Sequence, residues 1–316
     1  METANQPVPA ERRVLKMVSN AIVGKEEVIV RVFLAMLARG HVLLEDIPGV
    51  GKTTLAIAFS KALSLKYNRV QFTPDVLPSD VTGFTVFNKD TGSMVYTPGA
   101  VICNLFLADE LNRATSRTQS ALLEAMEEGQ VTVDGVSYPI PQPFIVIATQ
   151  NPVGAAGTQL LPDSQMDRFM VRLSLGYPEH SDELSLLRRK QGNSMLDLVE
   201  PVVNSNTLEY MRAQVDRVHV DSALLNYIVT IVGKTRSHPD LLLGASPRAS
   251  IALTSISRAM AFLQGRDYII PRDITALFKD TVAHRLILRP GAENENITAA
   301  SVLESILRTV YIPRIS

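Results

Sequence analysis

The chain has 316 residues, of which 46% are apolar, so it is long enough for two domains of ~100–200 residues each with ordinary cores. Thirty-one Lys and Arg residues against 32 Asp and Glu residues give a formal net charge of −1. This balance excludes an overall attraction to DNA, RNA or an anionic membrane, although a local basic patch stays open. The single cysteine, Cys103, excludes an intrachain disulfide and is expected to be a core thiol.

The N-terminal residues "METANQPVPAERRVL" contain no apolar core of a signal peptide. The longest apolar run, Val28 to Leu44, is interrupted by Arg31 and Arg39 and is too polar to span a bilayer. Five scattered histidines lack the spacing of transition-metal ligands. We therefore expect a cytoplasmic protein without membrane insertion.

Short apolar runs alternate with helical patterns from Gly40 to about Gly176. Several of these runs are almost wholly apolar, as strands covered on both faces must be, which predicts a parallel sheet in an α/β layer. The expected strands lie in "HVLLE", "NRVQFT", "NLFLADE", "FIVIATQ" and "FMVRLSL".

The stretch "DIPGVGKT" follows the first expected strand and precedes a helical pattern. It matches the phosphate-binding pattern G-x-x-x-x-G-K-[ST], except that Asp46 stands at the first glycine. Gly49 and Gly51 would let backbone N–H groups face an anion at a helix N-terminus. Lys52 would then reach the β- and γ-phosphates, and Thr53 would bind Mg²⁺. The alternative is a tight strand-to-helix turn without a ligand.

Two insertions interrupt the α/β layer. Residues 82–99 have two alternating runs around Asp90-Thr-Gly92, and residues 131–140 have them around Asp134-Gly135. Both patterns predict β-hairpins. Neither hairpin is needed to complete the sheet, so each is either a surface decoration or a working protrusion.

Two later strands are predicted to end in polar side chains near the phosphate loop. "NLFLADE" would carry Asp109 as the acid on the magnesium side and Glu110 as the base that orients and deprotonates water. The alternative is that both acids only cap the next helix. "FIVIATQNP" would place Asn151 beside them to bond the γ-phosphate and the water, unless Asn-Pro is an ordinary turn.

Two arginines complete the candidate site. Arg168 lies where a helix passes into the last strand, and a guanidinium there could stabilise charge on the transferred phosphoryl group from a neighbouring subunit. Its alternative is a salt bridge to Asp163 or Asp167. Arg248 lies in the first turn of a helix, where the dipole disfavours a cation, so an anion should share the place; a carboxylate would serve as well as a phosphate.

The strand texture disappears after "GYPEHSDE", and a boundary near 177–185 separates the α/β part from a helical one. Helical spacing covers two segments, from Leu224 to Thr235 and from Ala252 to Leu263. Ser246 as N-cap, a proline at the first turn and Gly265 beyond the end punctuate the second helix. We predict an α/β core over residues 1–180 and a smaller all-α lid over residues 181–316.

With these residues in place, the chain resembles an AAA+ ATPase and, within that superfamily, the MoxR family. The resemblance runs from about Ile22 to His284. Its most specific stretches are "LLEDIPGVGKTTLA" (43–56), "QFTPDVLPSDVTG" (71–83), "LFLADELNRATSRTQSALLEAMEEGQV" (105–131), "ATQNP" (148–152), "LPDSQMDRF" (161–169) and "SPRAS" (246–250).

The resemblance implies an ATP- and Mg²⁺-dependent ring ATPase, usually hexameric. It implies metal contacts from Thr53 and Asp109, with Glu110 as catalytic base. It further implies Asn151 as sensor 1, Arg168 as arginine finger and Arg248 as sensor 2. The nucleotide would be bound by Val23 and Gly24 at the adenine and by Pro48, Gly49, Val50, Gly51, Lys52, Thr53 and Thr54 in the Walker A loop.

The resemblance also indicates what the hairpins and partners would be. The hairpins at 82–99 and 131–140 correspond to insertions that face the ring's pore in related machines. The lid is displaced in that arrangement, which leaves open whether Arg248 acts on its own or a neighbour's nucleotide. Relatives are thought to remodel or mature partner proteins, often ones with a von Willebrand factor A domain. This chain has no such domain, so a partner of that kind would be a separate polypeptide.

The leading hypothesis is therefore an ATP-driven ring that remodels proteins. A nucleic-acid motor is the first alternative, but the near-zero net charge and the single Lys89 in the two hairpins make nucleic acid a poor partner. A metal-chelatase motor subunit is the second alternative, and the sequence does not distinguish it. A structural nucleotide-binding module would not need Glu110 or Arg168.

Overall fold

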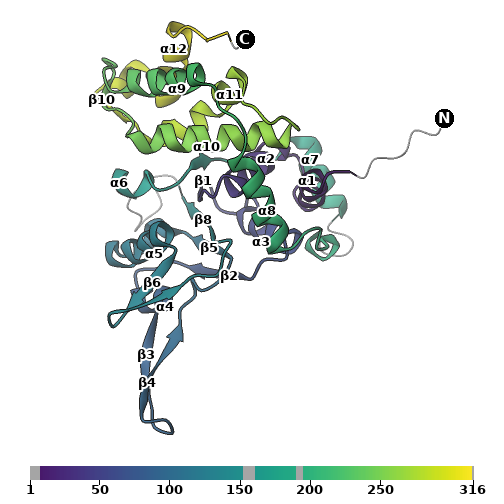
Figure 1. Ribbon diagram of the computed structural model, residues 1–316, viewed down its shortest axis with the longest axis vertical. Helices are drawn as coiled ribbons and strands as arrows, with labels where there is room; N and C mark the ends of the chain where they lie inside the picture. Colours follow the sequence, from purple (N-terminus) through teal and green to yellow (C-terminus); the bar gives the residue numbers. More distant parts are fainter. Residues whose placement is uncertain (1–7, 152–160, 190–194, 315–316) are drawn as a thin grey trace, which may run out of the picture.

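The computed structural model describes residues 8–151, 161–189 and 195–314 (Figure 1). A parallel five-stranded sheet in the order β2-β5-β8-β1-β9 forms the centre of the first part. The strands are β1 (Val42–Glu45), β2 (Tyr67–Gln71), β5 (Leu105–Asp109), β8 (Ile145–Gln150) and β9 (Val171–Leu173). All five coincide with the predicted runs, although β2 begins one residue before its run, at Tyr67. Because they are parallel, their carboxyl ends share one edge of the sheet.

Helices cover both faces of this sheet, which explains its nearly continuous apolar strands. Alternate residues of one strand point to opposite faces: Leu43 joins one hydrophobic cluster, while Val42 and Leu44 join another. The first cluster contains side chains of α4 (Pro78–Thr82) and α5 (Ser116–Glu128). The second is formed with α1 (Ala10–Ala21), α2 (Glu26–Leu37) and α3 (Lys52–Ala62).

Both predicted hairpins are present and pack against each other. They are β3 (Gly83–Asn88) with β4 (Ser93–Pro98) and β6 (Gln130–Val133) with β7 (Val136–Pro139). The rings of Tyr96 and Tyr138 stack at 3.8 Å with an interplanar angle of 12°, and Thr85 bonds to Asp134 across the hairpins. The longer hairpin projects from the lower end of the molecule (Figure 1). Two insertions that are separate in sequence thus form one protrusion.

The second part is mainly helical, as predicted. Its helices are α7 (His180–Arg189), α8 (Ser205–Asp216), α9 (Ser222–Thr235), α10 (Pro247–Leu263), α11 (Pro271–Val282) and α12 (Ala299–Thr309). The Ser246 side chain caps α10 by accepting the Arg248 N–H at 3.2 Å, as the sequence indicated. Short helices lie in the connections between the longer elements, namely α6 (Asp163–Met166), η1 (Leu111–Arg113), η2 (Met195–Leu198), η3 (Ala283–Arg285) and η4 (Ala292–Glu295).

The lid also contains a small antiparallel sheet that the sequence did not predict. Its strands, β10 (Leu241–Leu243) and β11 (Ile287–Leu288), are too short to show an alternating pattern, and their register shifts between Leu241 and Leu243. Strands of two or three residues leave almost no periodic signal.

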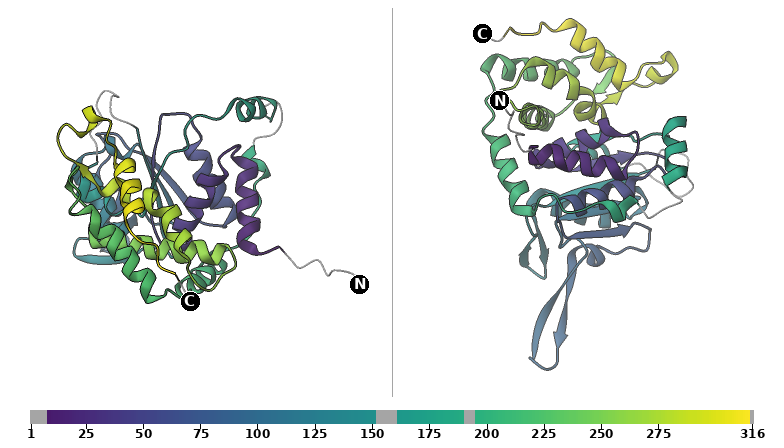
Figure 2. Two further views of the ribbon diagram at one scale, coloured as in Figure 1. Left: turned by 90° about the horizontal axis from the view of Figure 1, so that it is seen from above. Right: turned by 90° about the vertical axis from the view of Figure 1, so that its right-hand side faces the viewer.

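The helices of the lid lie against the sheet part (Figure 2). The two parts share a hydrophobic core. Helix α10 packs on α2, the Arg31 guanidinium pairs with Asp280 of α11, and Arg212 Nε donates to Met36 O at 2.9 Å. The division at residues 180 and 181 stays a prediction. Cys103 is fully buried, and burial raises the pKa of its thiol to about 12, as expected of a core thiol. Among the described helices, none combines the length and the apolar character that crossing a membrane requires.

Candidate active site

The predicted phosphate loop connects the end of β1 to the start of α3. Gly49 and Gly51 have φ angles of +86° and +98°, which residues with a Cβ rarely adopt. A Cβ at either glycine would meet no atom within 4 Å, so the loop surface there is open. Pro48 precedes Gly49, Val50 lies between the two glycines, and Lys52 begins the helix. The loop therefore has the backbone that an anion cradle requires.

Lys52 is the cation of this loop and is only 7% exposed. Its Nζ donates to Asp46 O at 2.6 Å and lies 3.4 Å from Asn151 Oδ1. Burial lowers the pKa of Lys52, and the nearby carboxylates of Asp46, Asp109 and Glu110 oppose that shift. Thr53 and Thr54 follow in the first turn of α3, both partly buried.

Asp109 ends β5 and is held by its two neighbouring strands. Thr149 Oγ1 of β8 donates to one carboxylate oxygen at 2.7 Å, and Arg69 of β2 donates to the other at 2.6 Å. Thr149 Oγ1 also accepts the Glu110 N–H at 2.8 Å. The end of β5 is thus tied to the strand that leads to Asn151.

Glu110 adopts a left-handed conformation, with φ of +56°, and its side chain faces Asn151. One carboxylate oxygen pairs with Arg113 at 2.7 Å, and the other accepts from Asn151 Nδ2 at 3.2 Å. The hydrogen bond from Arg113 is the main cause that lowers the pKa of Glu110. Glu110 stands at the N-cap position of the short helix η1 but makes no side-chain cap bond there, and the cap of α5 is Thr115.

The two predicted adenine-binding residues lie in the turn between α1 and α2. Gly24 has φ of +71° and lies against the carboxylate of Asp182, where a Cβ would clash. Lys25 Nζ donates to Tyr177 O at 2.9 Å. The Val23–Gly24 turn therefore packs on the segment that follows β9.

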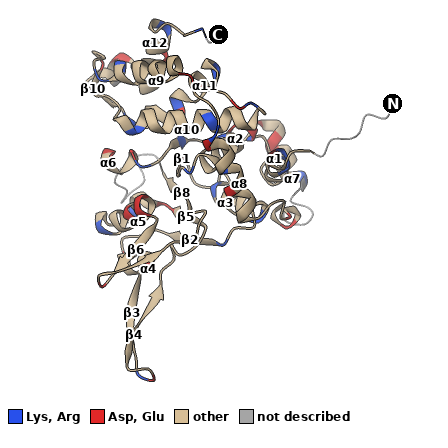
Figure 3. Cartoon of the chain, viewed as in Figure 1, with Lys and Arg blue, Asp and Glu red and all other residues tan. Residues whose placement is uncertain are grey.

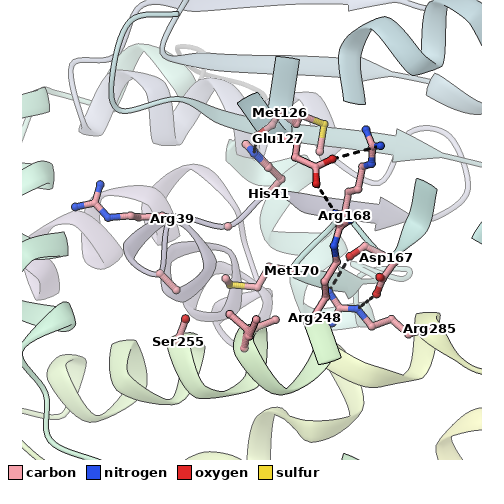
Figure 4. A pocket seen from close by; sticks show the side chains of 14 residues that line it. Arg39, His41, Met126, Glu127, Asp167, Arg168, Met170, Arg248, Ser255 and Arg285 are labelled. Carbon is pink, nitrogen blue, oxygen red and sulfur yellow. Dashed lines mark hydrogen bonds and ion pairs between the residues drawn. The ribbon is translucent and has the colours of Figure 1, made fainter. Parts of the chain in front are cut away.

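The structure places Arg168 and Arg248 together but at the opposite edge of the sheet. Both point into a cavity of about 320 Å³ and pair with Glu127 of α5 (Figure 4); the Arg168–Glu127 distance is 3.3 Å. Gly40 and His41, which precede β1, line this cavity, whereas the phosphate loop follows β1. The two arginines are therefore a strand length away from Lys52.

The ion-pair partner of Arg168 differs from the predicted alternative, whereas that of Arg248 agrees with the prediction. Arg168 pairs with Glu127 and not with Asp163 or Asp167, because Arg285 Nε occupies Asp167 at 2.7 Å. Arg248 does share its place with an anion, and that anion is a carboxylate within the same chain. The described residues thus unite Lys52, Asp109, Glu110 and Asn151, but not the two arginines, at the carboxyl edge. Pro152 of the "ATQNP" stretch lies outside the described residues.

Several residues of the site were missed from the sequence. Thr149 could have been inferred, because it lies near the end of β8, two residues before Asn151, which directly follows the strand. Arg69, Arg113 and Glu127 carry no motif, and their contacts depend on how the chain packs.

Comparison with known proteins agrees with this geometry. A family model described as "ATPase family associated with various cellular activities (AAA)" matches residues 41–171, and one described as "AAA lid domain" matches residues 233–306. Chaperone MoxR1 of Mycobacterium tuberculosis (strain ATCC 25618 / H37Rv) is 34% identical over 313 residues, which cover 96% of this chain and 82% of that protein. The chain belongs to the MoxR family of AAA+ ATPases.

One further relative and one solved structure are similar to this MoxR-family protein over nearly its whole length. YeaC of Bacillus subtilis (strain 168) is 45% identical over 305 residues, covering 96% of this chain and 95% of YeaC. The crystal structure of a candidate ATPase from Cytophaga hutchinsonii ATCC 33406 superposes with a TM-score of 0.90 at 38% identity, covering 96% and 95% of the two chains. The predicted family, fold class and ATPase activity are confirmed, and membership implies that the chain binds ATP.

Proposed function

We propose that this MoxR-family ATPase forms a homo-oligomeric ring, hexameric by analogy with its superfamily, in which each ATP site is completed by a neighbour. The observation that carries the proposal is the split of the candidate site between two edges of one sheet. Lys52 and Glu110 lie at the carboxyl edge, whereas Arg168 and Arg248 lie at the other. An identical chain that docks its arginine edge onto the phosphate loop would unite both halves.

The residues at the carboxyl edge fit ATP and Mg²⁺. The open loop around Gly49 and Gly51 would bind the phosphates with Lys52, and Thr53 and Asp109 would hold Mg²⁺. Mg²⁺, when bound, neutralises charge on the phosphate oxygens. The described residues contain no group of three or more His, Cys, Asp or Glu side chains that could hold a metal ion, so phosphate and water oxygens would supply the other Mg²⁺ ligands.

The remaining roles follow from the contacts of each side chain. Glu110 would accept the proton of the attacking water, and Asn151, bonded to both Lys52 and Glu110, would keep the base and the phosphate-binding cation in register. Arg168 and Arg248 would act in the neighbour's site, with Glu127 holding them until that site is engaged. Val23 and Gly24 would contact the adenine.

We further propose that the ring remodels or matures separate client proteins in the cytoplasm, among them proteins with a von Willebrand factor A domain. The joined hairpins are suited to contact a client because they expose apolar side chains, namely those of Phe84, Val86, Phe87, Met94 and Val95. Their charged side chains are Lys89, Asp90 and Asp134 only, so the protrusion offers little to a phosphate backbone (Figure 3).

A mixing experiment tests the shared site. Lys52→Ala and Arg168→Ala variants should each lose turnover. The first lacks the phosphate-binding cation, and the second lacks the arginine that stabilises charge on the transferred phosphoryl group, a contribution of ~10³–10⁵ in related systems. Mixed together, they should recover part of the activity, since some interfaces combine an intact Lys52 with an intact Arg168. Absence of recovery at every mixing ratio would reject the shared site.

A capture experiment tests the client. Glu110→Gln should bind ATP yet lose turnover by ~10²–10⁴ through the missing base. In ATP this variant should retain client proteins that the Lys52→Ala variant releases. Equal recovery with both variants would argue against an ATP-dependent client. The exposed Glu124→Gln variant is the matched control and should behave as wild type.

A further inference from the structure

Asp46 stands where phosphate-binding loops usually have glycine, and its side chain leaves the loop to bind another segment. One carboxylate oxygen accepts the Ser174 hydroxyl at 3.0 Å, the Leu175 N–H, and the Gly176 N–H at 3.0 Å. Asp46 is only 6% exposed. The three donors belong to the segment directly after β9, and we call residues 174–182 the strap.

The strap continues from Asp46 to the predicted adenine-binding turn. Tyr177 O accepts from Lys25, and the Asp182 carboxylate lies against Gly24. The strap therefore touches both segments that are predicted to hold opposite ends of the nucleotide. The last three residues of the strap belong to the first turn of α7, which begins at His180.

The hydrogen bonds of the Asp46 carboxylate would be lost if a residue without a side-chain acceptor stood at this position. Glycine or alanine would leave the buried Leu175 N–H without its acceptor, which is costly in a low-dielectric interior. Bonds to a carboxylate are also stronger than bonds to a neutral acceptor. The same residue's carbonyl accepts from Lys52, so Asp46 connects the phosphate-binding cation to the strap.

We propose that Asp46 is a positioning residue that fixes the strap to the phosphate loop and thereby keeps the strap in place beside the bound nucleotide. The inference rests on the proposed function, because it requires ATP to lie along the phosphate loop with its base at the Val23–Gly24 turn. Asp46 acts through the strap and does not touch the reacting atoms. Its loss should weaken nucleotide affinity and spare the rate at saturation.

Four variants test this assignment by titration with a fluorescent ATP analogue and by steady-state kinetics. Asp46→Ala should raise Kd and KM about tenfold or more while kcat stays within about threefold. Asp46→Asn keeps an oxygen acceptor and should recover most of the affinity. Ser174→Ala removes one donor and should raise Kd about two- to threefold. Asp75→Ala, on an exposed loop, is the control.

Amide hydrogen exchange tests directly whether Asp46 holds the strap in place. Exchange at residues 175 and 176 should accelerate in Asp46→Ala and Ser174→Ala, and remain slow in Asp75→Ala. If Asp46→Ala does not fold, Ser174→Ala decides: an unchanged KM and unchanged exchange at residues 175 and 176 in that variant would overturn the inference. A wild type that binds no ATP would instead overturn the proposed function. A wild type that binds ATP no better than Asp46→Ala, or a variant that loses kcat alone, would overturn only the role of Asp46.

Discussion

Glu110 is held in a position that depends on three groups from separate parts of the chain. Its N–H bonds to Thr149, and its carboxylate bonds to Asn151 and Arg113. The left-handed backbone at Glu110 turns the side chain away from the axis of β5 toward β8. A residue in this conformation persists only where its surroundings hold it. The network therefore fixes the proposed base before any substrate is bound.

Arg113→Ala should shift the acidic limb of the ATPase pH profile to higher pH. The Arg113 hydrogen bond is the largest cause of the lowered pKa of Glu110, and without it the carboxyl should titrate nearer its ordinary value. A general base works only when deprotonated, so activity would then be lost at a higher pH on acidification. The measurement is kcat against pH, with the exposed Arg117→Ala as control. An unchanged acidic limb would show that Arg113 does not tune this base.

His41 should make the fold sensitive to acid. Val146 N–H donates to its Nδ1 at 3.0 Å, its Nε2 lies 3.2 Å from Met126 O, and burial lowers its pKa to about 4. The unfolded chain, with a histidine pKa of ~6.5, then binds more protons between these two values. The contribution of His41 to stability is therefore complete above about pH 6.5 and is lost as the pH falls toward 4.

His41→Phe should be less stable than wild type near neutral pH, because two hydrogen bonds are lost, but its melting temperature should fall less on acidification. Part of the slope should remain, since burial also lowers the pKa of His284. Thermal unfolding followed by circular dichroism between about pH 7.5 and about pH 4.5 measures both effects. The exposed His180→Phe variant should keep the wild-type slope. Parallel curves for His41→Phe and wild type would contradict the assignment.

At the scale of elements, the sequence was informative wherever a strand or turn is determined locally. The central strands β5 and β8 could be predicted because burial on both faces demands nearly continuous apolar runs. The turn at Asp134-Gly135 could be predicted because Asp-Gly is a residue pair that readily adopts positive φ at both positions, and both residues do so in the structure. The same reasoning places Lys52, Asp109 and Asn151 at one edge, because parallel strands end together.

The elements that could not be predicted depend on contacts between distant segments. Glu127 looks like any exposed helix glutamate until the chain brings Arg168 and Arg248 to it. The Tyr96–Tyr138 stack joins residues of two hairpins whose local patterns say nothing about each other. Periodicity reports which face of an element is apolar, not which partner covers it.

Tyr138→Ala should loosen the longer hairpin while leaving the basal ATPase within about twofold. An aromatic pair contributes ~0.5–1.5 kcal/mol, so its loss should raise the population of the detached hairpin about two- to tenfold. Limited chymotrypsin digestion reports this directly, because Phe84 and Phe87 lie on that hairpin and are exposed. Tyr138→Phe keeps the ring and is the matched control. Equal digestion of Tyr138→Ala and Tyr138→Phe would show that the hairpins move independently.

At the scale of the whole molecule, the lid is continuous with the sheet part through the core shared by α2 and α10. Arg248 lies at the start of α10 and Arg168 just before β9, so lid and sheet part each contribute one arginine to the cavity around Glu127. A change in the angle between the two parts would therefore separate the two guanidinium groups. The relative position of Arg168 and Arg248 therefore depends on how the lid is oriented against the sheet part.

If a neighbour completes each ATP site, as we propose, catalysis depends on assembly. At saturating ATP, turnover per chain should fall when the protein is diluted below the dissociation constant of the oligomer, because Lys52 and Glu110 then lack the neighbour's Arg168. Nucleotide binding should persist on dilution, since the phosphate loop is contained in one chain. Sedimentation at each concentration identifies the species, and equilibrium titration of a fluorescent nucleotide gives the binding. Constant turnover per chain through the transition to monomer would show that one chain completes its own site, and that the arginine edge serves another purpose.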